Sequence, residues 1–385
     1  MTTAAIKGFR DIEDASRRIA IRNIIENVFK NYNFIPVETP VVEAEDFVRG
    51  NNTDDEAVSD IFKLKDRGER NLALRYEFTF QLKRLAMNKK LPYKRYEIGY
   101  VFRDEPITGN RWKQFTQCDI DVVGAGVKEE AEILMIASEI FAKLGIKITI
   151  NVNNRKLLNE IMDKSGIKPE NKFAVIKEID KLDKLKEEEI KTNLKKYGAE
   201  MILDIFKKKE KDFEKYESYN EIKNLKEECK ALGIDIVFVP FLARGLSYYN
   251  GSIYEIKTGE MKETISAGGS YLVNGIQSTG ISFGLDRLES VAKIGEKSNK
   301  TLVISIGQDK EAIKLVENLR ENNVPVTLMY GKISKAMDYA NSYNIPFVIF
   351  VGEEEVKKKK FKLRDMKTGK ESFVSENELL KKISI

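Results

Sequence analysis

Residues 155–232 differ in character from the sequence on both sides of them, and they constrain the fold more than any other segment. They are rich in Lys, Glu, Leu and Ile at helical spacing, a pattern that predicts helices with a solvated face and a small core. Contact between their lysines and phosphate groups is an alternative role. A coiled coil is disfavoured because no heptad repeat is sustained. We therefore expect a helical insertion.

The sequence before this insertion combines helical and strand patterns. Two prolines in residues 34–40 disfavour a helix and favour an edge or interface strand. Apolar spacing predicts the remaining elements, which are helices over 14–30, 79–90 and 127–144 and strands over 96–103, 112–123 and 146–152. The first two of these strands form a predicted hairpin with residues 105–110 as its loop.

Strand patterns return after the insertion, and the composition changes again near residue 300. Glycine-rich β patterns cover 234–241, 253–257 and 264–283. Beyond them, short apolar strands alternate with helices, which is typical of a compact α/β module with a parallel sheet. Its predicted strands are 302–306, 324–329 and 347–351, its helices are 309–322 and 334–344, and a hairpin turns at 367–370.

The overall composition places the chain among proteins without a membrane segment. Its 385 residues exceed what one hydrophobic core usually organises, so two or three domains are expected. No apolar run approaches the ~18 residues of a membrane helix, and residues 1–14 lack the apolar core of a signal peptide. We predict a cytoplasmic protein with no membrane contact.

The absence of histidine restricts the chemistry. It excludes Ser-His-Asp and Cys-His triads, His-ligated metals and imidazole acid–base catalysis. The two cysteines, Cys118 and Cys229, are far apart and have no CxxC spacing, so we expect buried thiols and no disulfide framework or structural zinc site. The net charge of +5 permits a polyanionic partner without requiring one.

No P-loop and no strand-GxGxxG-helix unit occurs, so a nucleotide must bind by another device. The predicted hairpin offers one. Arg103 and Glu105 are two apart and share a face if the strand continues. A guanidinium suits a pair of phosphate oxygens, a carboxylate can accept from an exocyclic amine, and Phe115 can stack on a base. A solvated surface hairpin is the alternative interpretation.

Two further stretches combine arginine with glycine. Arg244 follows an apolar strand and precedes Tyr248 and Tyr249, which either line a pocket or belong to the core. Residues 280–288 run from a strand into a helix with Arg287 in its first turn. A helix N-terminus with a guanidinium can form an anion site, and a turn glycine beside a surface arginine is the alternative.

Taken in order, these stretches resemble the class II aminoacyl-tRNA synthetases, specifically the histidyl-tRNA synthetase family. The helix at 14–30 with Pro40 resembles the dimer-forming first motif, 96–121 the second and 280–288 the third. Residues 74–79 resemble the strand that holds the substrate amino group. Residues 242–249 and 267–271 resemble the two histidine-specific motifs. Residues 117–121 look like the archaeal and eukaryotic branch. The resemblance covers residues 7–154 and 234–385.

The resemblance implies an α+β fold with three parts. These are a class II antiparallel-sheet catalytic domain (1–154 and 233–298), a helical insertion domain (155–232) and a C-terminal α/β anticodon-binding domain (299–385). It implies a homodimer through the 14–40 region. It also implies ATP-dependent ligation of L-histidine to tRNA(His) through a histidyl adenylate, with Mg²⁺ accompanying ATP, unknown metal ligands and no structural metal.

The resemblance also assigns individual residues. Arg103 and Arg244 should hold the α-phosphate from two sides as the catalytic residues, with Arg244 where related enzymes place a metal ion. Glu105 should lie near the adenine amine, Phe115 under the ring and Arg287 at the adenine face and outer phosphate. The residues expected to bind histidine are Glu77, Thr79 and Gln117 at the α-ammonium and Asp121, Tyr249 and Tyr271 at the imidazole.

Two departures from the family pattern flank the expected pocket. Ser247 stands where the family usually has Asp, and Ser270 where it usually has Arg. We expect altered contacts around the pocket without loss of activity. A non-catalytic regulatory paralogue that serves histidine biosynthesis is the main competing interpretation. A pure RNA-binding module is the second, and it would not need both Arg103 and Arg244.

Overall fold

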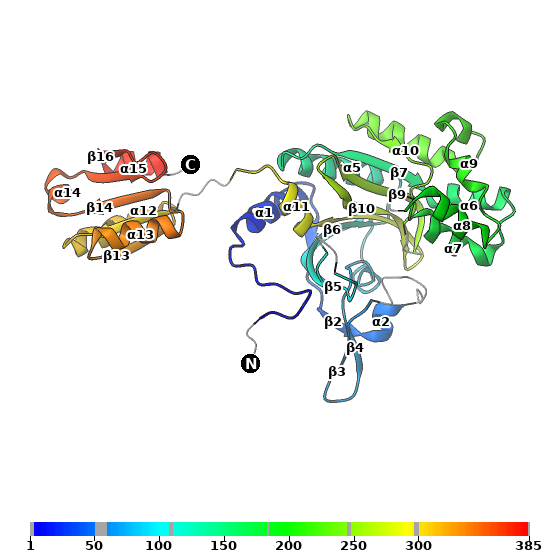
Figure 1. Ribbon diagram of the computed structural model, residues 1–385, viewed down its shortest axis with the longest axis horizontal. Coiled ribbons are helices and arrows are strands. Elements are labelled where there is room, and N and C mark those ends of the chain that lie inside the picture. The colour runs from blue at the N-terminus through cyan, green and yellow to red at the C-terminus, as the bar shows by residue number, and fades with distance from the viewer. Residues whose placement is uncertain are drawn as a thin grey trace. The chain divides into compact units, whose positions relative to one another are not determined.

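The computed structural model describes residues 4–50, 60–107, 111–182, 185–244, 248–295 and 300–383. The chain divides into two compact units, Met1–Ile294 and Gly295–Ile385 (Figure 1). Within the described ranges, no helix is both long and apolar enough to cross a bilayer.

The first unit is built on an eight-stranded sheet in the spatial order β1-β5-β6-β11-β10-β9-β7-β8. Its central pairs are antiparallel, and only the edge pairs β1–β5 and β7–β8 are parallel. This arrangement confirms the expected antiparallel-sheet domain. The strands are β1 (Ile35–Pro36), β5 (Tyr93–Phe102), β6 (Gln114–Val123), β7 (Thr149–Asn154), β8 (Val237–Phe238), β9 (Tyr249–Thr258), β10 (Met261–Val273) and β11 (Ile276–Gly284).

One face of this sheet is covered by helices. Helix α1 (Ser16–Asn31) contributes Ile21, Ile25 and Phe29, which are spaced four apart and fully buried. Burying each such side chain contributes roughly 1.5–3 kcal/mol. Helices α5 (Val127–Lys143) and α11 (Leu285–Val291) add apolar residues to the same core.

The strand period directs alternate residues of β6 to opposite faces. Cys118, Ile120 and Val122 belong to the core beneath the helices, so the residues between them point to the other face. Gln117 and Asp121 are on that second face, where the expected substrate residues gather.

The helix expected over 79–90 is much shorter in the structure. Only α4 (Leu82–Leu85) is helical, with turns on both sides. Asn88 adopts a left-handed conformation with φ of 61°, which ends helical geometry there.

A separate three-stranded antiparallel sheet lies next to this region. It is formed by β2 (Val42–Ala44), β4 (Asn71–Leu74) and β3 (Lys63–Lys65), with α2 (Glu45–Arg49) beside it.

The insertion is helical, as predicted, and its helices gather at one side of the first unit (Figure 1, green). Its apolar residues, such as Ile176, Leu194 and Ile222, join the same hydrophobic cluster as the sheet. The prediction of a small core for the insertion is therefore wrong, because its apolar residues share the core of the sheet. The elements are α6 (Arg155–Lys164), η1 (Pro169–Asn171), α7 (Lys172–Ile179), α8 (Glu187–Lys195), α9 (Ile202–Phe206), η2 (Glu210–Phe213) and α10 (Tyr219–Ala231).

The second unit confirms the expected α/β module. Its sheet has the order β13-β12-β14-β15-β16, with the first three strands parallel and the last two forming the predicted hairpin. The elements are β12 (Thr301–Ser305), α12 (Asp309–Glu321), β13 (Val326–Tyr330), α13 (Ile333–Ser342), β14 (Phe347–Val351), α14 (Glu353–Lys358), β15 (Phe361–Asp365), β16 (Glu371–Val374) and α15 (Glu376–Ile383).

Candidate active site

Two cavities lie on the open face of the eight-stranded sheet, with volumes of about 170 Å³ and 60 Å³. They share lining residues, including Arg103, Gln117 and Arg244, so they form one cleft with two ends. Every residue to which the resemblance assigns a substrate contact lines this cleft. Glu105, Phe115 and Arg287 line only the larger end, whereas Glu77, Thr79, Asp121, Tyr249 and Tyr271 line only the smaller end.

The larger end is rich in guanidinium groups. Arg103 lies at the end of β5, with its carbon Cζ 5.3 Å from the centre of the Phe115 ring and Nη1 3.7 Å from a Glu105 oxygen. Arg111 binds the other oxygen of Glu105 at 2.8 Å. Arg287 donates from the first turn of α11 to the carbonyl oxygen of Thr264.

These arginines lie close enough to repel one another. Burial lowers the pKa of Arg287, and the positive charges of Arg111, Arg103 and Arg244 lower it further. Four cations line this cavity against two carboxylates, Glu105 and Asp286, and this excess of positive charge favours an anionic ligand. A polyphosphate provides that charge, and the planar guanidinium suits its oxygen pairs.

The backbone at and before Arg244 is held by Asn153 at the end of β7 and by Arg155 at the start of the insertion. The side-chain amide of Asn153 donates to the carbonyl oxygens of Pro240 and Leu242, and Arg155 donates to the carbonyl of Arg244 at 2.8 Å. The Arg244 side chain lies 3.7 Å from Glu255, and its buried Nε has no hydrogen-bond partner among the described residues. The Nε–H is therefore available to a bound anion.

The smaller end is polar and aromatic. Tyr271 donates its hydroxyl to Oδ1 of Asp121, and burial together with the charge of Asp121 raises the pKa of this phenol well above its usual value. Tyr248, Tyr249 and Tyr271 form an aromatic cluster, with ring centres 4.7–6.5 Å apart. An acid and phenols in a buried pocket can hydrogen-bond both nitrogens of a small heterocycle.

Two glycines leave room for this pocket. A Cβ at Gly280 would lie 2.2 Å from Oδ1 of Asp121 and 2.8 Å from the Tyr271 hydroxyl. A Cβ at Gly268 would lie 2.0 Å from the carbonyl oxygen of Gly280. The glycines of β10 and β11 therefore let the strands and the pocket residues approach closely.

Comparison with known proteins supports one family. The protein-family model described as histidyl-tRNA synthetase matches residues 8–288 of this chain. A second family model, described as anticodon binding domain, matches residues 300–384. The chain is 36% identical to "Histidine--tRNA ligase 2" of Shouchella clausii, covering 96% of this chain and 97% of the relative. This chain belongs to the histidyl-tRNA synthetase family. A "Histidine--tRNA ligase 1" of Bacillus cereus is 35% identical, with 95% of this chain and 94% of that protein covered.

A solved histidyl-tRNA synthetase supports the same conclusion. The crystal structure of the enzyme from Nostoc sp. superposes with a TM-score of 0.85 at 25% identity, covering 100% of this chain and 99% of the other. These relatives are bacterial, and they leave the archaeal and eukaryotic branch assignment a prediction.

Sequence reasoning missed several residues of this histidyl-tRNA synthetase cleft. Trp112 and Asp286 line the larger end, and Asp119 lines the smaller. Asp119 could have been found because it lies between Gln117 and Asp121 at the strand period of two. Burial and the charge of Asp121 raise its pKa well above the usual value.

Buried acceptor atoms beside this residue complete the smaller end. Gln117 donates from Nε2 to the Ser282 hydroxyl at 2.8 Å, which leaves its Oε1 free to face the cleft. Gln117 Oε1 and Asp119 Oδ1 are buried without hydrogen-bond partners among the residues described. Acceptors of this kind suit a substrate ammonium group.

The two departures from the family pattern have different outcomes. Ser270 does not flank the cleft as expected, because it donates its hydroxyl to Glu130 of α5 on the opposite face of the sheet. Its neighbour Tyr271 faces the cleft, as the strand period requires. Ser247 lies outside the described residues.

Asp286 ties the cleft to α1, and we expect its removal to destabilise the first unit. It binds Arg18 at 2.9 Å, Arg10 at 3.0 Å and the backbone N–H of Thr116 at 3.0 Å. Burial alone would raise its pKa, but these partners outweigh burial and lower it. A lowered folded-state pKa contributes stability above the unfolded value, near 3.8, that is lost as pH falls through the folded value.

Asp286→Asn should therefore lower the free energy of unfolding by roughly 3 kcal/mol at pH 7. The loss relative to the unchanged protein should shrink below about pH 4. Urea unfolding followed by fluorescence of Trp112, the only tryptophan of the chain, measures this effect. An unchanged midpoint at pH 7 would contradict it.

Proposed function

We propose that Arg103 and Arg244 hold the α-phosphate of ATP from two sides in the reaction of this protein. The protein is a histidine–tRNA ligase, which joins L-histidine to tRNA(His) through a histidyl adenylate. The observation that carries the assignment is the position of both arginines at the junction of the two cavities. A phosphate bound there would face a nucleotide at one end and an amino acid at the other.

The larger end is proposed to hold the rest of ATP. Phe115 offers a ring face for the adenine, and Glu105 offers a carboxylate oxygen for its exocyclic amine. Arg287 would contact the adenine face and the outer phosphate. These roles are consistent with the cationic lining, which opposes the negative charge of the triphosphate.

The smaller end is proposed to hold histidine. Glu77, Thr79 and Gln117 would bind the α-ammonium, and Asp121, Tyr249 and Tyr271 would bind the imidazole. A pocket that hydrogen-bonds both ring nitrogens rejects apolar isosteres, because these leave buried polar groups unpaired.

In the first step the histidine carboxylate attacks the α-phosphorus, and the bond to pyrophosphate breaks. Negative charge builds on the phosphorus oxygens in the transition state. Preorganised guanidiniums stabilise that charge without having to reorient. Arg103 and Arg244 are the groups that supply this stabilisation.

In the second step a terminal ribose hydroxyl of the tRNA attacks the adenylate, and AMP leaves. The chain has no histidine to act as a base. We therefore propose that a phosphate oxygen of the adenylate accepts the hydroxyl proton. A mutant scan that finds an indispensable protein base for the transfer step would contradict this.

Magnesium is proposed to enter with ATP. Among the described residues no group of three or more acidic or cysteine side chains could hold a metal ion. Mg²⁺ is often bound by only one or two carboxylates plus phosphates, and Glu105 is a carboxylate in the larger cavity. When bound, the ion would neutralise phosphate charge alongside the arginines.

We keep the three-part division of the chain as a proposal, with 1–154 and 233–298 catalytic, 155–232 the insertion and 299–385 the tRNA-binding part. Exposed aromatic residues of the second unit, Tyr330 and Tyr343, could stack on unpaired bases. We also propose a cytoplasmic location, since the tRNA product serves translation there.

A homodimer through residues 14–40 is likewise proposed. Ile19 and Ile35 are 55% and 53% exposed, and Ile35 lies on the edge strand β1. Val41 and Val42, which follow this region in the sequence, are also exposed. Association would cover both the apolar side chains and the strand edge. Sedimentation of the full chain as a monomer at micromolar concentration would refute the dimer.

Histidine-dependent ATP–pyrophosphate exchange tests the function. We expect labelled pyrophosphate to enter ATP only when histidine is added, and not with other amino acids. A regulatory paralogue or a pure RNA-binding module would show no exchange. Exchange independent of histidine would contradict the proposed substrate.

A further inference from the structure

A fully buried arginine, Arg95, lies behind the smaller cavity without lining it. Its side chain is 0% exposed. It belongs to β5, and its cross-strand partner on β6 is Asp121. Burying an unpaired guanidinium is costly, so this residue needs local compensation. Two of its contacts, with Asp121 and with the backbone at Phe78, lead to the substrate pocket.

Arg95 joins the two halves of the proposed histidine site. Its Nη2 lies 2.7 Å from Oδ2 of Asp121, the proposed imidazole acceptor. The same nitrogen donates to the carbonyl oxygen of Phe78 at 2.7 Å. Phe78 lies between Glu77 and Thr79, which are proposed to hold the α-ammonium. One guanidinium therefore contacts both the imidazole-binding and the ammonium-binding segments.

Both oxygens of the Asp121 carboxylate are thereby engaged. Tyr271 donates to Oδ1, while Arg95 lies against Oδ2. Gly280 is the cross-strand neighbour of Asp121 on the other side, and only its lack of a side chain makes room for this carboxylate. The orientation of the Asp121 carboxylate is thus determined by Arg95, which does not itself line the cavity.

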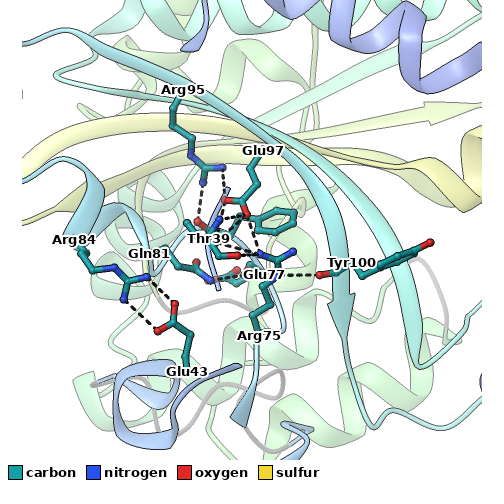
Figure 2. A network of polar contacts seen from close by, with 10 residues as sticks. Thr39, Glu43, Arg75, Glu77, Gln81, Arg84, Arg95, Glu97 and Tyr100 are labelled. Carbon is teal, nitrogen blue, oxygen red and sulfur yellow. Dashed lines mark hydrogen bonds and ion pairs between the residues drawn. The ribbon is translucent and has the colours of Figure 1, made fainter. Parts of the chain in front are cut away.

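Arg95 also lies next to a second buried ion pair, formed by Arg75 and Glu97. Figure 2 shows Arg95 and Arg75 pointing toward Glu97 from two sides. Arg95 lies 3.9 Å from Glu97, and Arg75 binds Glu97 at 2.9 Å. Thr39 donates to Glu97, and Arg75 donates to the Thr39 carbonyl. This links the pocket to the segment that carries the proposed dimer surface.

We propose that Arg95 is a positioning residue that determines the affinity of the cleft for histidine while leaving ATP binding unaffected. This inference rests on the proposed function of the smaller cavity. Without Arg95, Asp121 would be a buried carboxylate lacking its cation, and the backbone at Phe78 would lose its donor. Both halves of the amino-acid site would then lose their alignment. Within the described part of the chain, no hydrogen bond or ion pair joins Arg95 to the residues that line only the ATP end.

The test compares substrate dependence in ATP–pyrophosphate exchange. We expect Arg95→Met to raise KM for histidine by about 10–100-fold, with KM for ATP changed by less than about twofold. A structural defect that only reduces the folded fraction lowers kcat and leaves KM unchanged. Arg95→Lys keeps the charge but not the planar fork, so it should raise KM for histidine less than Arg95→Met does.

Arg84 provides a matched control. It forms an arginine–glutamate pair with Glu43 at 2.7 Å, to one side of the Arg95 group (Figure 2). Arg84→Met should leave both KM values unchanged. If Arg95→Met does not fold, Arg95→Lys carries the same test. Unchanged KM for histidine in the folded Arg95 variant, or an equal rise in both KM values, would overturn the proposal. Absence of exchange in the unmodified protein would instead refute the proposed function.

Discussion

Arg244→Ala should slow histidine-dependent adenylate formation by roughly a hundredfold or more, because one preorganised donor of this kind contributes about 3 kcal/mol in the transition state. Arg244 lines both ends of the cleft, and its buried Nε has no hydrogen-bond partner within the described part of the chain. Water cannot replace a guanidinium aimed at one atom. Arg103→Ala should have a similar effect for the same reason.

Single-turnover formation of adenylate, with the enzyme in excess over labelled ATP, measures this step directly. Arg70→Ala is a suitable control, because Arg70 is an exposed arginine paired with Asp66. It should react at the rate of the unchanged protein. Adenylation at a near wild-type rate in Arg244→Ala would remove this arginine from the mechanism.

Gly280→Ala should nearly abolish the use of histidine. Its new Cβ would lie 2.2 Å from Oδ1 of Asp121 and 2.8 Å from both the Tyr271 hydroxyl and the Ile120 carbonyl. The strands cannot separate without breaking the ladder of β6 and β11. The carboxylate must therefore move, and a displacement of about 1 Å can cost a hundredfold in activity.

The same substitution at Gly259 distinguishes an effect on the pocket from a general effect of replacing a glycine in this sheet. Gly259 lies in the turn between β9 and β10, where an added Cβ meets nothing within 4 Å. Gly259→Ala should keep the unmodified kcat/KM for histidine, whereas Gly280→Ala should lose most of it. A folded Gly280→Ala protein with an unchanged KM for histidine would show that Asp121 does not contact the substrate.

The helices and strands that depend on local sequence patterns could be predicted from the sequence. Period-two alternation predicted the β5–β6 hairpin, and apolar spacing predicted α1 and α5. The prediction of a helix over 79–90 was wrong, since only α4 is helical there, and the left-handed conformation of Asn88 is not revealed by apolar spacing. The core of the insertion was also mispredicted. Which face of its helices is buried depends on the neighbouring sheet, as the shared cluster containing Ile176 shows.

The residues of the candidate site that belong to sequence motifs could be predicted from the sequence. Residues from five separate stretches were placed in one cleft, and the structure lines a single cleft with all of them. Arg95 could not be found this way. Its role depends on Phe78 and Asp121, which approach it only when β5 and β6 pair and the 74–79 segment packs behind them. A buried charge can be recognised only after its surroundings are known.

The position of the α-phosphate between the two arginines is tested most directly by a crystal structure of the protein with a non-hydrolysable histidyl-adenylate analogue. We expect the group that replaces the α-phosphate to lie between the Arg103 and Arg244 guanidiniums, with the adenine on Phe115 and the imidazole against Asp121 and Tyr271. An analogue bound elsewhere, or bound here with its phosphate substitute away from both arginines, would show that Arg103 and Arg244 do not hold the α-phosphate.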